Sequence, residues 1–205
     1  MLFAKSFSLL LSDNISFGLY VVLFCLMTLS ISCGDIGYKS RSIGKLTNGR
    51  KEGVWEIYDD KGGLKERNTY KNDTLNGPQL TFDRNGKIYT KAFYKMGIFI
   101  DSFRLYFDNG QIRSESWFDS LGREQGIYKV YHKNGQLSEI GRSVNGATVD
   151  TAKGYDESGH LQYLEIYKMG SKEKSITYFD KEGVALKIEY YKGDSLYAQN
   201  LLNSR

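Results

Sequence analysis

Hydrophobic and polar residues alternate along most of the chain, in short runs separated by glycine-containing turns. The runs at 55–58 (WEIY) and 103–106 (FRLY) place every second side chain on one face of a strand. Asparagine, aspartate or lysine stands just before many of the glycines, and Asn and Asp tolerate the left-handed backbone of a tight turn. The pattern therefore predicts short β-strands joined in hairpins.

These strands recur with a period of 24 residues. A turn glycine occurs six times, with four spacings of 24 and one of 25, at Gly62, Gly86, Gly110, Gly135, Gly159 and Gly183. An aromatic residue precedes each of them by four positions, at Tyr58, Phe82, Tyr106, Tyr131, Tyr155 and Phe179. We expect one hairpin per unit and an all-β fold: an elongated array of about six β-hairpin repeats that form an antiparallel meander sheet.

A second aromatic series lies eight positions after the turn glycine. It comprises Tyr70, Tyr94, Phe118, Tyr167 and Tyr191, and Ser143 interrupts it. Aromatic residues at one position of successive hairpins are expected to form ladders, and each cross-strand pair contributes roughly 0.2–1 kcal/mol. The sheet is expected to bend, bulge or pack poorly around Ser143.

The N-terminal region resembles a targeting signal. Residues 15–32 carry no charge and would span about 27 Å as a helix, close to the thickness of a bilayer core. The run ends in residues 29–34 (LSISCG), which resemble the lipobox of bacterial lipoproteins, with Ser30 where that family prefers leucine. The resemblance implies a hydrophobic signal helix that is removed and a lipid on Cys33. The alternatives are an uncleaved anchor helix and cleavage by another peptidase.

The domain organisation follows from these patterns. We expect a lipoprotein-type signal peptide at 1–32, a tether at 33–48, the repeats at 49–193, and a C-terminal cap or tail at 194–205. A first, irregular half-repeat that uses Ile43 and Leu46 is the alternative for the second half of the tether.

The repeat unit resembles a known family. Residues 53–58 (GVWEIY) and 126–131 (GIYKVY) carry the likeness best, and YKMG occurs at both 94–97 and 167–170. Over 49–193 the chain resembles MORN-type repeats, and in particular the bacterial MORN-variant family whose members are labelled antitoxin-like. This resemblance implies β-hairpin arrays that act as interaction scaffolds and share no catalytic residues.

Composition narrows the class of protein. Among 205 residues there are 29 aromatics and 22 glycines but a single proline, and the net charge is +4. So many aromatics and so balanced a charge exclude collagen, a coiled coil and a disordered tail. Basic and acidic residues alternate, as at 65–67 (KER), which predicts a mixed soluble surface and no nucleic-acid partner.

Few residues suggest chemistry. The two cysteines are Cys25 and Cys33, so a lipidated Cys33 leaves no thiol in the mature chain. His132 and His160 fall beside turn glycines and are expected to be solvated. The sequence predicts no catalytic residue, no metal site and no cofactor, hence a protein that is not an enzyme; a hydrolase with paired carboxylates is a minor alternative.

Many aspartates lie in or beside the turns, where turn capping and calcium binding are the two interpretations; we expect capping. They are Asp59, Asp60, Asp83, Asp108, Asp119, Asp156 and Asp180.

The aromatics also offer candidate partner-binding residues. Trp55, Phe103 and Tyr128 occupy corresponding positions of their units, and Trp117 is a fourth candidate. If this face of the sheet is open to solvent, the first three form an apolar stripe that would bind a partner. The alternative, which we favour, is that this face is packed.

The functional prediction combines these features. We expect a non-enzymatic, lipid-anchored repeat protein of the cell envelope, held in the membrane through Cys33 and binding another protein or an envelope polymer. Its expected location is the outer membrane or the periplasmic face of a bacterial envelope. The alternative is an antitoxin or immunity-type protein that blocks a toxin, although an exported N-terminus argues against a cytoplasmic partner.

Overall fold

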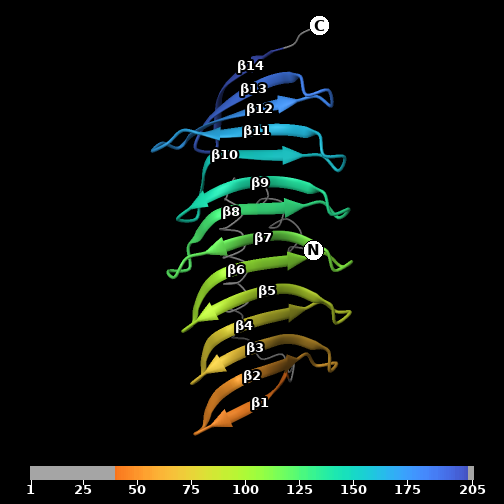
Figure 1. Cartoon of the computed structure of the whole chain (residues 1–205), viewed down its shortest axis with the longest axis vertical. Coiled ribbons are helices and arrows are strands. Elements are labelled where there is room, and N and C mark those ends of the chain that lie inside the picture. The colour runs from red at the N-terminus through yellow and green to blue at the C-terminus, as the bar shows by residue number, and fades with distance from the viewer. Residues whose placement is uncertain (1–39, 203–205) are drawn as a thin grey trace, which may run out of the picture.

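The computed structural model describes residues 40–202, which form one open antiparallel sheet of 14 strands in sequence order (Figure 1). This confirms the predicted all-β meander of hairpins. The predicted signal helix and Cys33 lie outside the described residues. Within residues 40–202, no helix has the length and hydropathy needed to cross a bilayer.

The strand bounds follow the repeat. The strands are β1 (Arg41–Thr47), β2 (Arg50–Tyr58), β3 (Leu64–Lys71), β4 (Thr74–Phe82), β5 (Ile88–Lys95), β6 (Ile98–Tyr106), β7 (Ile112–Phe118), β8 (Glu124–Tyr131), β9 (Leu137–Val144), β10 (Ala147–Tyr155), β11 (Leu161–Tyr167), β12 (Glu173–Phe179), β13 (Ala185–Lys192) and β14 (Ser195–Leu201).

Two strands lie outside the predicted repeat region. Strand β1 falls within residues 33–48, where a tether was predicted, and pairs with β2. The indole of Trp55 covers Gly44 of β1, and its Nε1 donates a hydrogen bond to the carbonyl of Lys45 at 3.2 Å. The tether prediction is therefore corrected over 41–47, where the alternative half-repeat applies. Strand β14 falls within 194–205 and pairs with β13.

The tight turns owe their shape to glycine and aspartate. Each repeat glycine has positive φ, for example +83° at Gly62. In the turn before Gly86, Asp83 accepts hydrogen bonds from the amides of Asn85 (2.8 Å) and Lys87 (2.9 Å). The same pair of bonds recurs at Asp59, Asp119, Asp156 and Asp180. Turn capping is thus confirmed for these five aspartates.

Replacing Asp83 with alanine should therefore lower the free energy of unfolding by about 1 kcal/mol, because two amides lose a charged acceptor. Urea denaturation of the two proteins measures this difference. Asp60→Ala is the matched control, since Asp60 is exposed in a neighbouring turn that is capped by Asp59 instead. Equal losses in the two variants would contradict the capping role.

The turns on the opposite side of the sheet bond each hairpin to the one before it. Gly97 donates its amide to the carbonyl of Leu75 at 2.8 Å, and Gly146 donates to Glu124 at 2.9 Å. Two turns on this side, at 119–123 and at 168–173, are different. The first contains the residue that lengthens its repeat to 25, and it closes on itself through the Asp119 carbonyl, which accepts from the Gly122 amide at 3.0 Å. The second closes in the same way, through the Lys168 carbonyl, which accepts from the Ser171 amide at 3.2 Å.

One face of the sheet carries the core, and we call it the inner face. Its buried apolar side chains are Trp55, Ala92, Tyr94, Phe103, Phe118, Tyr128, Ala152 and Ile176. Aromatic rings lie across small residues of neighbouring strands, which is how a single layer buries them. A Cβ built on Gly141 would lie 2.5 Å from the Tyr128 hydroxyl, so a larger side chain there would displace the ring.

The inner-face aromatics form a ladder in the first half of the array. The ring of Phe99 lies 5.5 Å from that of Tyr94 and 4.3 Å from that of Phe118, and it also contacts Phe103 at 5.9 Å. Phe99 thus connects aromatic residues of successive units, which were expected to stack directly.

Candidate functional site

The structure separates the four predicted partner-binding residues. Trp55, Phe103 and Tyr128 are buried on the inner face, as the packed-face interpretation expects. Trp117 lies on the opposite, outer face, and 37% of its surface is exposed. Of these four side chains, Trp117 is therefore the one that a partner can reach in this conformation.

The inner face becomes more polar towards the C-terminal half of the array, where tyrosine hydroxyls donate hydrogen bonds to glutamates. Glu139 accepts hydrogen bonds from Tyr128 at 2.8 Å and from Tyr163 at 2.9 Å. Glu189 accepts from Tyr191 at 2.8 Å and from the ammonium group of Lys187 at 2.6 Å. Burial, reinforced by the Glu139 carboxylate, raises the pKa of Tyr163 well above its usual range. These phenols stay protonated and act as donors.

Two lysines complete this network. The Lys187 ammonium lies 4.4 Å from the ring centroid of Tyr178, and the Lys174 ammonium lies 3.4 Å from Glu165. Lys174 also lies over the rings of Tyr167 and Tyr191. Since each carboxylate already accepts bonds from neighbouring phenols or lysines, the arrangement rigidifies the sheet.

A buried carboxyl group lies at the middle of the array. Glu124 is 2% exposed and accepts one hydrogen bond, from the hydroxyl of Ser143 at 3.1 Å. Its other oxygen, Oε1, has no hydrogen-bond partner among residues 40–202. Burial raises the pKa of the Glu124 carboxyl, and the hydrogen bond from the Ser143 hydroxyl opposes that rise.

Glu124 was not singled out from the sequence, although the strand register explains it. It stands opposite Phe118, as Leu75 stands opposite Tyr70 and Phe99 opposite Tyr94. A carboxyl thus replaces an apolar side chain in the unit that also has Ser143 in place of an aromatic residue. The sequence feature that could have indicated Glu124 is the extra residue between Gly110 and Gly135, which moves Glu124 into the strand position opposite Phe118.

The histidines take part in turn structure. The Nε2 atom of His132 lies 2.8 Å from the carbonyl oxygen of Tyr155, and Nδ1 of His160 lies 3.1 Å from Oδ2 of Asp156. His160 is exposed, as expected, and His132 is half-buried; each side chain also has a protein partner. Residues 40–202 contain no group of three or more His, Cys, Asp or Glu side chains placed to hold a metal ion.

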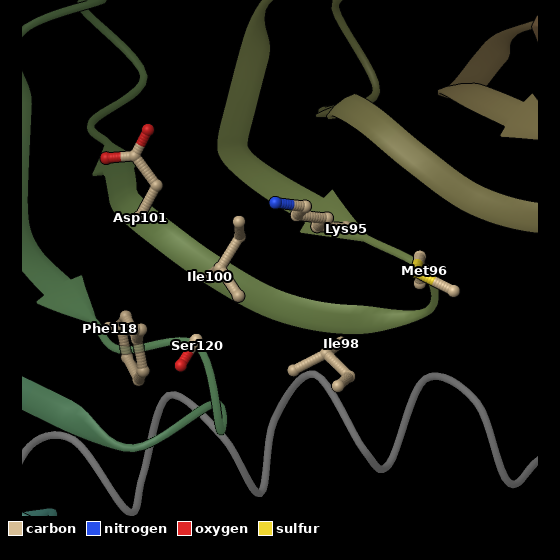
Figure 2. Close-up of a pocket in the computed structure, with 7 residues that line it drawn as sticks. All are labelled: Lys95, Met96, Ile98, Ile100, Asp101, Phe118 and Ser120. Carbon is tan, nitrogen blue, oxygen red and sulfur yellow. The ribbon is translucent and has the colours of Figure 1, made fainter.

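A hollow of about 460 Å³ opens between the turn at 96–97 and the turn at 119–123 (Figure 2). Met96, Ile98, Ile100 and Phe118 supply its apolar lining. Met96 is 77% exposed and Ile98 is 43% exposed, so apolar surface faces solvent here. Exposed apolar surface around a hollow is typical of an interaction site.

Consecutive hairpins of constant period in one open sheet define a hairpin-repeat protein. Residues 51–72, 75–96, 124–145 and 151–169 match the family model described as the MORN repeat variant. These four matches support a MORN-repeat family for the chain, in agreement with the resemblance noted in its sequence.

A search of the curated proteins finds no match. Among solved structures, a TarM mutant of S. aureus is 11% identical over 62% of this chain and 23% of its own, with a TM-score of 0.40. Accessory secretory protein 1, 2 and 3 of Streptococcus pneumoniae is 14% identical over 71% and 19%, with a TM-score of 0.21. The chain spans about a quarter or less of the structures it matches.

Proposed function

We propose that this chain is a non-enzymatic repeat scaffold of the bacterial cell envelope, anchored by a lipid on Cys33, that binds another protein through its hairpin array. The observation that carries the proposal is the open sheet with exposed apolar side chains around the hollow at Met96 and Ile98. MORN repeats are generally protein- or membrane-binding modules, and the four matches support that role.

The anchor rests on residues 29–34, where small residues precede Cys33 directly after the uncharged run. We expect metabolic labelling with palmitate to mark the wild-type protein, and globomycin to cause its precursor to accumulate. Cys33→Ser should lose the label completely, because the lipid would be attached to that sulfur. Cys25→Ser is the matched control and should keep it. An unlabelled wild-type protein, or a labelled Cys33→Ser protein, would refute the anchor.

The partner class is tested separately. Affinity purification of the full chain from envelope fractions, followed by mass spectrometry, should recover an envelope protein. When this protein is purified and titrated against the chain, its binding should be saturable. Recovery of a nuclease or another toxin as the main partner would instead favour the antitoxin alternative.

A further inference from the structure

The hollow lies beside a turn that closes on its own backbone. The amide of Gly97 bonds to β4 through Leu75, and the amide of Gly146 bonds to β8 through Glu124. The longer turn at 119–123 closes on its own backbone, through the amide of Asp119 donating to the carbonyl of Arg123 at 2.9 Å. The hollow borders Ile98 and Phe118 and lies between two turns that follow one another along the array (Figure 2).

The residue at the rim of the hollow has an unusual backbone. Met96 has a φ of +51°, in a two-residue turn with Gly97. Three other turns place asparagine in this conformation, namely Asn48, Asn72 and Asn145. Asparagine adopts positive φ far more readily than methionine does. Methionine at this position is therefore less stable than asparagine would be. Its flexible, polarisable side chain faces solvent, and such side chains are common on adaptable binding surfaces.

Two opposite charges flank the apolar lining. Lys95 and Asp101 both line the hollow and both are exposed. Within residues 40–202 neither of them forms an ion pair, whereas Lys133 pairs with Asp108 and Lys168 with Glu173. An apolar floor between an unpaired cation and an unpaired anion is complementary to a ligand with an apolar centre and one charge of each sign.

We propose that the hollow receives an apolar side chain from an extended segment of a partner protein, which carries an acidic residue beside Lys95 and a basic residue beside Asp101. This proposal rests on the proposed scaffold function and adds the chemistry of the partner. The volume of about 460 Å³ accommodates one large side chain, such as leucine or phenylalanine. The apolar contact provides affinity, and the two charges fix the direction of the segment.

The test uses the full chain in lipid nanodiscs and the methyl NMR signals of its methionines and isoleucines. The probe is an acetylated, amidated heptapeptide with the sequence Ser-Glu-Ser-Phe-Ser-Lys-Ser. We expect saturable shifts of the Met96, Ile98 and Ile100 methyl groups, and no shift at Met169, which lies in a different turn. Replacing the central phenylalanine of the peptide with serine should abolish the shifts.

Met96→Asn is the decisive variant, because it cannot fail merely by unfolding. It introduces the residue that three equivalent turns already carry, so its melting temperature should equal or exceed that of the wild type. Its affinity for the peptide should fall at least tenfold. Met169→Asn is the matched control and should bind as the wild type does.

Several outcomes would overturn the proposal. They are unchanged affinity in Met96→Asn, equal binding of the serine peptide, and no shift at Ile98 and Ile100 at millimolar peptide. A Lys95→Ala protein that binds as tightly as the wild type would refute the charge assignment. If an envelope partner binds Met96→Asn and wild type equally, the hollow is not the binding site, and the scaffold function is still supported. If the partner titration fails for the wild type, the scaffold function itself is wrong.

Discussion

Phe103→Ala should lower the free energy of unfolding by about 3–5 kcal/mol, the largest loss we expect from a single truncation in the array. Phe103 is buried in the cluster formed with Ala92, Tyr94 and Phe118, and it contacts the ring of Phe99. A single-layer sheet has no second layer that could collapse into the cavity. Urea denaturation followed by tryptophan fluorescence measures the change, because Trp55 and Trp117 lie in different hairpins.

Trp117→Ala is the control for this result. Its side chain lies on the outer face and is 37% exposed, so truncation removes less buried surface, and we expect less than half of the Phe103→Ala loss. Equal losses would contradict the assignment of the core to the inner face. Because repeat arrays can unfold in parts, hydrogen exchange should show the Phe103→Ala opening centred on β5–β7.

Glu124→Gln should stabilise the protein at neutral and alkaline pH by roughly 1–3 kcal/mol, because it removes a buried charge that has no cationic partner. Glutamine keeps the shape of the side chain and can still bond to Ser143. The raised pKa means that the folded state binds the Glu124 proton more tightly than the unfolded state does. The wild type should therefore lose stability as pH rises from the unfolded carboxyl pKa of about 4.3 through the folded pKa.

Denaturation at a series of pH values between 4 and 9 tests this sign. The wild-type and Glu124→Gln curves should converge near pH 4 and separate as pH rises. Glu157→Gln, in an exposed turn, should follow the wild type throughout. Below pH 4, the loss of stability is caused by other carboxyl groups, whose pKa is lowered in the folded state. The amide of Arg123 lowers the pKa of Asp119 to about 2, so its contribution is lost as pH falls through that value. A Glu124→Gln curve parallel to the wild type would refute the prediction.

The local features of the fold were predictable from the sequence. The turns at Gly62 and Gly86 depend on residues within four positions, since Asp59 and Asp83 cap them through nearby amides. Strand order followed from the same cause, because short turns force consecutive strands to pair. Two strands, β1 and β14, were not expected from the repeat, because β1 lacks the aromatic residue that marks the later units and β14 follows the last turn glycine of the series.

The candidate site was less predictable. Met96 was visible in the repeated YKMG segment, but its left-handed backbone and the hollow beside it were not. The hollow is also lined by Ser120 of the turn at 119–123, which is far from Met96 in the sequence. Likewise Glu124 and Ser143 are 19 residues apart, and only the register brings their side chains within 3.1 Å.

The sequence by itself determined where the chain turns and that its strands pair in order, because backbone conformation and hairpin closure depend on near neighbours. The tertiary structure alone decided which aromatics are buried. In a single layer, burial of a ring depends on the residue beside it in the next strand, as Gly44 lies beneath Trp55 and Gly141 beneath Tyr128. The same lateral contacts buried three of the predicted binding residues and left Trp117 and Met96 at the surface.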